Sequence, residues 1–171
     1  MKKLLFIALL TLGIAGFVYF HYSTPQVLNR RLDSLLDSLS FGTISLQENT
    51  KAGDRFAEHF LEEVTFTGNG NDIIAGTPTR DELRELYLEQ LRSFARNCQA
   101  SHSGDTNITL KSADNAQMET TISLQGTFHG NQSFQRDIPV RFTWQKKKGS
   151  WHISAVQLLE PTGLHLSLIH I

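Results

Sequence analysis

The sequence predicts a single α+β domain in which helices come first and a strongly curved antiparallel sheet follows. Apolar residues recur at helical spacing in three segments before about residue 99, and they alternate with polar residues after it. Short turns separate the alternating segments, so consecutive strands are expected to pair antiparallel. Helices gathered ahead of such a sheet are typical of α+β proteins.

The first helix is predicted to begin after Ser23, because Ser-Thr-Pro supplies a cap and a first-turn proline. Gly42 is expected to end it. Its apolar stripe consists of leucines, namely Leu28, Leu32, Leu35, Leu36 and Leu39.

The second helix is predicted to start at a capping box, in which Ser45 and Glu48 satisfy each other's backbone amides. Its apolar stripe contains Ala52, Phe56, Ala57, Phe60 and Leu61. Alternation over residues 63–67, a Gly-Asn turn at 68–71 and a short return over 72–76 predict a small hairpin next.

The third helix follows a second capping box, formed by Thr79 and Glu82. Its predicted apolar face contains Leu83, Leu86, Tyr87, Leu91, Phe94, Ala95 and Cys98. Cys98 is the only cysteine, which excludes an internal disulfide and a cysteine-based zinc site. Its place on an apolar stripe favours simple burial.

From about residue 99 onward the chain reads as strands separated by turns at residues 113–115, 129–131 and 148–150. One face of the first alternating segment carries Met118, Thr120, Ile122, Leu124 and Phe128. One face of the next carries Ile138, Val140, Phe142 and Trp144. The final strand is predicted from Trp151 and Ile153 to about Leu159.

Residues 1–22 are predicted to be an uncleaved signal anchor. Lys2 and Lys3 precede an uncharged run over residues 4–20, at the short end of what spans a bilayer. The preceding lysines place the N-terminus in the cytoplasm and the rest outside it. We therefore predict a single-pass inner-membrane protein with a periplasmic domain. A cleaved signal peptide is the alternative, and either interpretation exports the domain.

The other end of the chain contains a segment that we interpret as an artefact. Residues 166–171, Leu-Ser-Leu-Ile-His-Ile, match the translation of a transposon-end adapter used in preparing sequencing libraries. Glu160-Pro161-Thr162-Gly163 already reads as a strand ending in a turn. The predicted folded domain is therefore residues 23–162.

Composition and charge argue against nucleic acid as a partner. Of 171 residues, 40% are hydrophobic and 19% charged, and the formal net charge is −1. The protein thus lacks an overall positive field that would hold nucleic acid. The only tight basic cluster, Lys146–Lys148, lies beside a Gly-Ser turn. Such a cluster is typical of the solvated tip of a hairpin.

The order of these segments resembles the nuclear transport factor 2-like (SnoaL-like) superfamily. The resemblance rests on the final hairpin, Phe142–Val156, with its Lys-Gly turn and Trp-His-Ile, and on Phe60–Val64 followed by Ile74-Ala75-Gly76 and a capped helix. It covers residues 25–161 and is nearest to anchored, exported bacterial members with an extra leading helix. It implies a cystatin-like cone of three helices wrapped by a strongly bent sheet, with a pocket between them.

No catalytic, cofactor-binding or metal-binding residue is assigned from the sequence, because this superfold hosts isomerases, dehydratases, hydrolases and non-catalytic modules. An isomerase-like site needs a carboxylate base at the pocket, and no inward-facing strand position carries one. A dehydratase-like site needs His and Asp facing one cavity. The histidines have no metal-ligand spacing.

Candidate pocket-lining residues are His59, Phe60, Tyr87, Phe94 and Trp144. His59 can serve as an acid or base near neutral pH, and the alternative is a boundary histidine hydrogen-bonded at a helix edge. For Tyr87 the alternative is a core residue with a wet hydroxyl. For Trp144 it is packing beside the hairpin.

Three functions stay open. The first is a non-catalytic envelope module that binds a small apolar ligand or a partner protein, which the anchor and the missing catalytic set favour. The second is an isomerase- or dehydratase-type enzyme with His59 as its base. The third is a homodimeric scaffold that uses the outer face of the sheet. No cofactor is expected for any of them.

Overall fold

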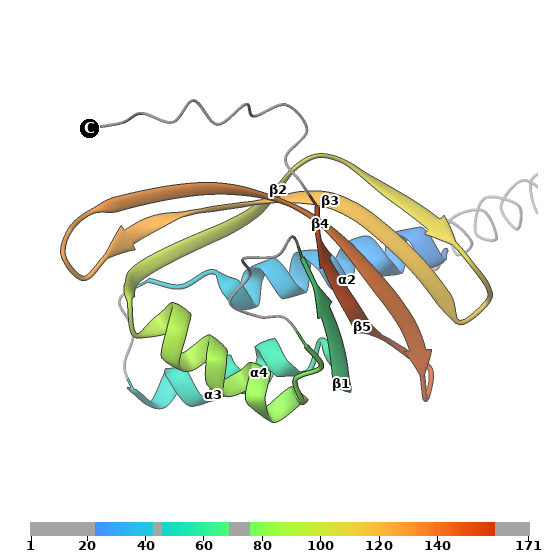
Figure 1. Cartoon of the computed structure of the whole chain (residues 1–171), viewed down its shortest axis with the longest axis horizontal. Helices are drawn as coiled ribbons and strands as arrows, with labels where there is room; N and C mark the ends of the chain where they lie inside the picture. The colour runs from blue at the N-terminus through green and yellow to red at the C-terminus, as the bar shows by residue number, and fades with distance from the viewer. Residues whose placement is uncertain (1–22, 43–45, 69–75, 160–171) are drawn as a thin grey trace, which may run out of the picture.

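The computed structural model describes residues 23–42, 46–68 and 76–159, and it shows helices packed against one bent sheet (Figure 1). The predicted anchor at residues 1–22 and the predicted artefact at 166–171 lie outside these ranges. Within them, no helix is both long and apolar enough to cross a membrane. The helices are α2 (Thr24–Leu39), α3 (Leu46–Ala57), α4 (Arg80–Leu86) and the π-helix η1 (Tyr87–Arg92). The strands are β1 (Phe60–Thr67), β2 (Ala95–Leu110), β3 (Asn115–Phe128), β4 (Ser133–Lys147) and β5 (Ser150–Leu158).

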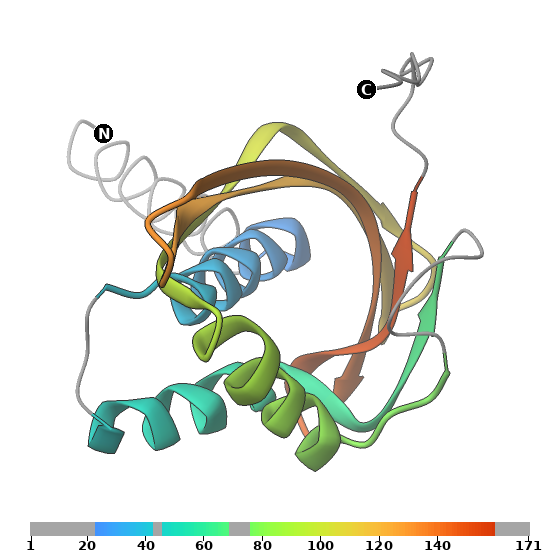
Figure 2. The same ribbon diagram turned by 60° about the vertical axis from the view of Figure 1, so that its left-hand side comes forward.

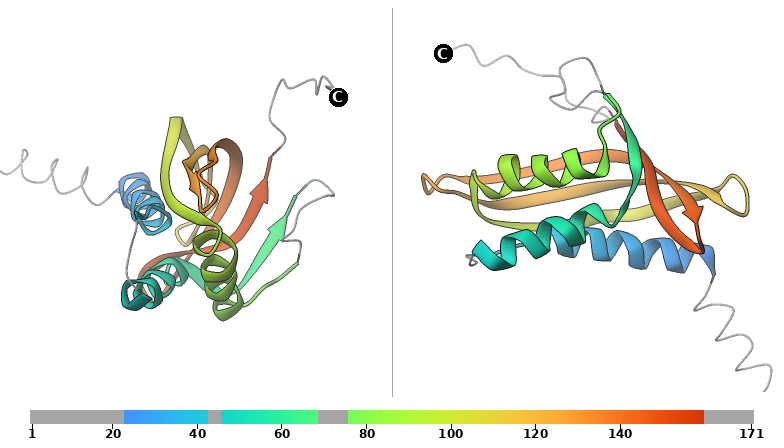
Figure 3. Two further views of the ribbon diagram at one scale, coloured as in Figure 1. Left: turned by 90° about the vertical axis from the view of Figure 1, so that its left-hand side faces the viewer. Right: turned by 90° about the horizontal axis from the view of Figure 1, so that it is seen from below.

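The five strands form one sheet in the order β1-β5-β4-β3-β2. The three pairings among β2, β3, β4 and β5 are antiparallel, as predicted. The edge pairing of β1 with β5 is parallel, because β1 reaches the sheet from the helical half of the chain rather than through a hairpin. The long strands arch, and the helices lie under the arch (Figures 2 and 3).

The core lies between the inner face of the sheet and the helices. From α2 it takes the leucine stripe, whose members Leu28 and Leu32 are fully buried. Its other members include Phe60, Val64, Leu83, Met118, Val140, Phe142, Trp144, Trp151 and Ile153. The predicted inward faces of β3 and β4 are therefore confirmed, except that Phe128 at the end of β3 is 39% exposed.

The predicted C-terminal ends of the first two helices are each wrong by a few residues. Helix α2 ends at Leu39, and Phe41 instead forms a bridge with Cys98 of β2. Helix α3 ends at Ala57, and Phe60, predicted on that helix, begins β1. Pairing with β5 overrides the helical pattern here, since the Ile153 amide donates to the His59 carbonyl at 2.8 Å. Ser45 and the predicted return strand, apart from its last residue, lie outside the described residues.

The third helix departs most from its prediction. Its capping box is confirmed, with the Glu82 amide donating to Thr79 Oγ1 and the Thr79 amide donating to the Glu82 carboxylate. Beyond Leu86, however, the chain forms a π-helix and then passes into β2 at Ala95. Cys98 is buried as predicted, but it lies on a strand.

Candidate functional site

A cavity of about 390 Å³ lies between the helices and the inner face of the sheet. Helices α2, α3 and α4 and the π-helix supply Leu35, Leu39, Phe56, Leu83, Leu86, Tyr87, Gln90 and Leu91. The strands supply Phe60, Phe66, Ile122, Leu124, Ile138, Val140, Phe142, Val156 and Leu158. The period-two alternation of the strands directs these side chains to one face, so the cavity follows directly from the sheet pattern.

Only two of these lining residues, Tyr87 and Gln90, are polar. The Tyr87 hydroxyl donates to the Ser38 carbonyl at 2.7 Å, and its ring stacks on Phe56 with centroids 4.6 Å apart. Burial raises the pKa of Tyr87. The phenol is thus held in place, protonated, with its proton already engaged. The lining contains no carboxylate and no imidazole from the described residues.

The five sequence-predicted candidates lie in three different environments. Phe60 and Tyr87 line the cavity. Trp144 is fully buried in the core and is not among the residues that line the cavity. His59 is buried elsewhere, and Phe94 is 61% exposed at the surface.

His59 occupies a tight site where α2 meets the start of β1. Its side chain is 4% exposed, Nε2 stands 3.5 Å from Ser34 Oγ, and Nδ1 has no hydrogen-bond partner in the described structure. Burial, assisted by the nearby Arg31, lowers the pKa of His59 to about 4. An imidazole with so low a pKa is a weak base at neutral pH. The hypothesis that His59 is a general base of the cavity is therefore not supported by its position.

Phe94 is exposed because it lies in the turn between η1, which ends at Arg92, and β2, which begins at Ala95. An α-helical pattern places residues 87, 91 and 94 on one face, whereas the chain forms a π-helix over Tyr87–Arg92 and leaves it before Phe94. Arg92, the last residue of the π-helix, is 8% exposed, while Phe94 is exposed. The burial of Arg92 was not predicted from the sequence, because the spacing of apolar side chains does not indicate where a helix becomes π-helical.

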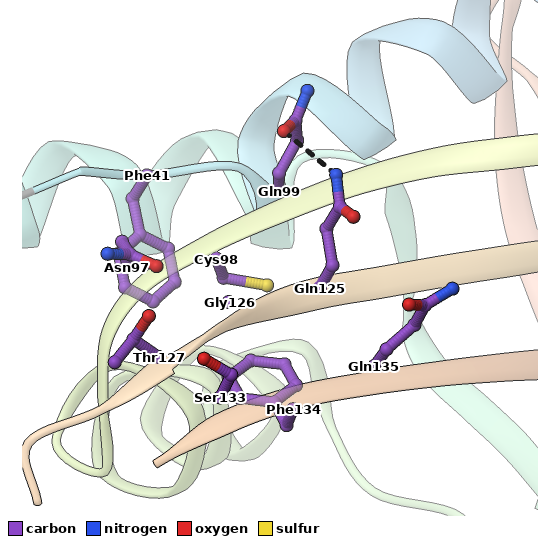
Figure 4. Close-up of a pocket in the computed structure, with 10 residues that line it drawn as sticks. All are labelled: Phe41, Asn97, Cys98, Gln99, Gln125, Gly126, Thr127, Ser133, Phe134 and Gln135. Atoms are coloured by element: carbon purple, nitrogen blue, oxygen red, sulfur yellow. Dashed lines mark hydrogen bonds between the residues drawn. The ribbon is translucent and has the colours of Figure 1, made fainter. Parts of the chain in front are cut away.

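A second depression of about 640 Å³ opens at the junction of β2, β3 and β4 (Figure 4). Its glutamines, Gln99, Gln125 and Gln135, stand side by side on paired strands, with Gln125 Nε2 donating to Gln99 Oε1 at 3.1 Å. A side chain at Gly126 would collide with the Asn97 carbonyl oxygen, so only glycine fits there. Cys98 also lines this depression. Burial raises the pKa of its thiol, which makes it a poor nucleophile.

No cluster of three or more His, Cys, Asp or Glu side chains that could hold a metal ion occurs in the part of the chain that the structure describes. Neither depression offers a charged residue among its lining side chains. The site with the clearest chemical character is therefore the inner cavity, and that character is apolar.

A bent sheet closed over helices around an apolar cavity defines the class of this protein, a cone-shaped α+β fold. The profile of the SnoaL-like domain matches residues 49–157. This match covers more than half of the chain, and the chain belongs to the SnoaL-like domain family.

Solved structures agree on the fold. The chain is similar to a putative scytalone dehydratase from Novosphingobium aromaticivorans, with a TM-score of 0.62 and 16% identity over 78% of this chain and 80% of that one. It is similar to a hexachlorocyclohexane dehydrochlorinase, LinA-type3, from Novosphingobium barchaimii, with a TM-score of 0.61 and 14% identity over 84% and 93%. It is also similar to a nuclear transport factor 2-like superfamily protein from Salmonella enterica, with a TM-score of 0.64 and 12% identity over 85% and 96%. No curated protein matches the chain.

Proposed function

We propose that this protein is a non-catalytic binder of an apolar small molecule. The lining of the inner cavity carries the proposal, because fifteen of its seventeen residues are apolar. Removing apolar ligand surface from water supplies the free energy of binding in such a site. The volume of about 390 Å³ lies within the range of cavities that hold small organic molecules.

An enzymatic role is the alternative, and the family and its structural neighbours make it chemically reasonable. Dehydration or isomerisation needs a titratable side chain that reaches the substrate. The cavity offers only the Tyr87 phenol, which already donates to the Ser38 carbonyl. His59 lies outside the lining. These observations favour binding over acid–base catalysis.

The proposal includes a place in the cell. Residues 1–22 would hold the domain on the outer face of the inner membrane, as the lysine-flanked apolar run predicts. We expect added protease to digest the domain in spheroplasts and to leave it undigested in intact cells. Digestion only after the inner membrane is broken would place the domain in the cytoplasm and contradict the prediction. A homodimer through the sheet stays a prediction from the sequence.

Filling the cavity is expected to abolish ligand binding while the fold is kept. Ile138 is a half-buried lining residue of β4, and Ile138→Trp places an indole in the space. With Nile red, a neutral apolar fluorophore, as the probe, we expect saturable binding to the parent chain and an affinity at least about tenfold weaker in the variant. Fluorescence titration of the full chain measures both.

Gln145→Trp is the matched control, since Gln145 is exposed on the same strand and outside the lining. It adds the same indole and should leave the affinity unchanged. Any uptake of dye by the apolar N-terminal segment is common to all three chains and cancels in the comparison. Equal affinities for the parent and Ile138→Trp chains would remove the cavity as the binding site.

A further inference from the structure

Lysines gather at one end of the domain, on two neighbouring turns. The turn between β4 and β5 carries Lys146–Lys148, which are all exposed. The Lys146 amide donates to the Asp114 carbonyl of the turn between β2 and β3 at 2.8 Å, so the two turns lie together. Residues 111–115 and 145–151, which we call the basic end, contain four lysines and one carboxylate, that of Asp114. The basic end is therefore locally positive, although the formal net charge of the chain is −1.

The backbone at the tip of this end is unfavourable for a lysine. Lys148 has a φ of 51° and Gly149 a φ of 84°, and Lys147 pairs with Ser150 across them, as in a type I′ hairpin turn. The first central position of such a turn favours asparagine, aspartate or glycine, because most other side chains crowd the backbone when φ is positive. A tip that needs only to be solvated is served equally well by asparagine. A lysine held there points to a use for its charge.

The basic end lies at the same end of the domain as the start of α2 (Figures 1 and 3). Helix α2 has no acidic residue in its first turn and no basic residue in its last turn, which is the reverse of what the helix dipole favours. Its two arginines, Arg30 and Arg31, lie in its first half, and Asp33 and Asp37 lie in its second half. The charge order of α2 therefore adds positive charge on the side of the basic end.

The predicted anchor would bring this end close to a bilayer. The apolar run of the sequence ends at Phe20 and the described structure begins at Ser23, and three residues span at most about 11 Å. Attraction between lysines and anionic head groups falls off within a Debye length, which is about 8 Å at physiological ionic strength. So short a connection therefore places the start of α2, and the end of the domain to which it belongs, within reach of the head groups.

We propose that the basic end binds the surface of an anionic bilayer, with Lys146–Lys148 among the phospholipid head groups. This inference rests on the membrane anchor, which is part of the proposed function, and it adds a second contact that orients the domain. The lysine ammonium group is a compact charge on a flexible stem and suits phosphate groups that are themselves mobile. Each lysine at such a surface strengthens binding by about fivefold. No residue of the basic end lines the inner cavity, so this contact and ligand binding can be tested separately.

Quenching by spin-labelled head groups in proteoliposomes tests the inference. The full chain is reconstituted with phosphatidylcholine that carries the spin label, either alone or with about 30% phosphatidylglycerol as the anionic lipid. A fluorophore is attached to Ser150→Cys at the basic end or to Ser133→Cys, because these exposed serines begin β5 and β4 at opposite ends of the sheet. Cys98→Ala is common to all chains. We expect phosphatidylglycerol to increase quenching of the label at residue 150 at least about twofold and to leave the label at residue 133 unchanged.

Charge variants of the tip identify the groups responsible. Replacing Lys146–Lys148 together with glutamine should remove the effect of phosphatidylglycerol, and replacing them with arginine should keep it. Lys148→Asn should reduce the effect without lowering the free energy of unfolding in urea, because asparagine accepts a positive φ more readily than lysine does.

The outcomes separate this contact from the rest of the proposed function. Equal quenching of the label at residue 150 in the two lipids overturns the inference, as does an effect that survives the glutamine variant. In either case a chain that floats with the vesicles leaves the anchor standing. A chain that does not float with them overturns the anchor and the inference together. Cavity-dependent binding of Nile red tests the ligand-binding function independently of all these results.

Discussion

Replacing Trp144 with alanine is expected to lower the free energy of unfolding by about 3–5 kcal/mol. Trp144 is fully buried on β4, its indole packs edge-on against Phe142 at 6.2 Å, and it is paired with Ala116 of β3 and Ile153 of β5. Alanine leaves a large void in a sheet that cannot collapse around it. Small domains have only about 5–15 kcal/mol of stability, so the variant should be close to unfolded.

Trp144→Phe separates packing from polarity at the same site. The Trp144 Nε1–H has no acceptor in the described structure, so phenylalanine removes an unsatisfied donor while keeping most of the buried ring. We expect a loss of about 1 kcal/mol or less. Guanidinium unfolding followed by circular dichroism measures both variants without depending on tryptophan emission. Equal losses for the two variants would show that the indole N–H, rather than ring volume, stabilises the core.

Acidification is expected to destabilise the fold through His59. Its pKa is about 4 in the folded protein and 6.5 in an ordinary setting, so the unfolded chain binds the proton first. The stability contributed by neutral His59 is complete above pH 6.5, is lost progressively as the pH falls toward 4, and changes no further below that. We expect a loss of about 2 kcal/mol, less than the full shift of the pKa implies, because local opening lets water reach the charged ring.

His59→Leu should flatten this part of the stability–pH profile, measured by urea unfolding at a series of pH values. His129, exposed in the turn after β3, gives the control His129→Gln, which should keep the parent slope. Burial also lowers the pKa of His152, so a smaller slope of the same sign should persist in His59→Leu. A slope unchanged by His59→Leu would show that His59 is protonated as readily in the folded chain as in the unfolded one.

Local chemistry in the sequence was enough for most of the sheet. The alternating faces of β3 and β4, the turns around residues 113–115, 129–131 and 148–150, and the capping box at Thr79 all depend on neighbours within a few residues. Period-two patterns set which side chains face the helices, so the apolar character of the cavity wall was also implicit in the strands.

Contacts between residues far apart in the sequence determined features that the apolar periodicity did not predict. Phe60 fits a helical stripe, yet pairing with Ile153 makes it the first residue of a parallel edge strand. His59 and Phe60 are adjacent in the chain, but only Phe60 reaches the cavity.

The last such feature is the π-helix η1 at Tyr87–Arg92, at whose end Arg92 is buried, while Phe94 in the turn after it is exposed. The sequence by itself determined the class of fold and the apolar wall of the cavity, because both follow from which side chains prefer to leave water. Only the tertiary structure buried the charged side chain of Arg92 beside the Tyr87 ring, outside the lining of the cavity. π-Helices are rare, and nothing in the apolar pattern of the sequence indicated this one.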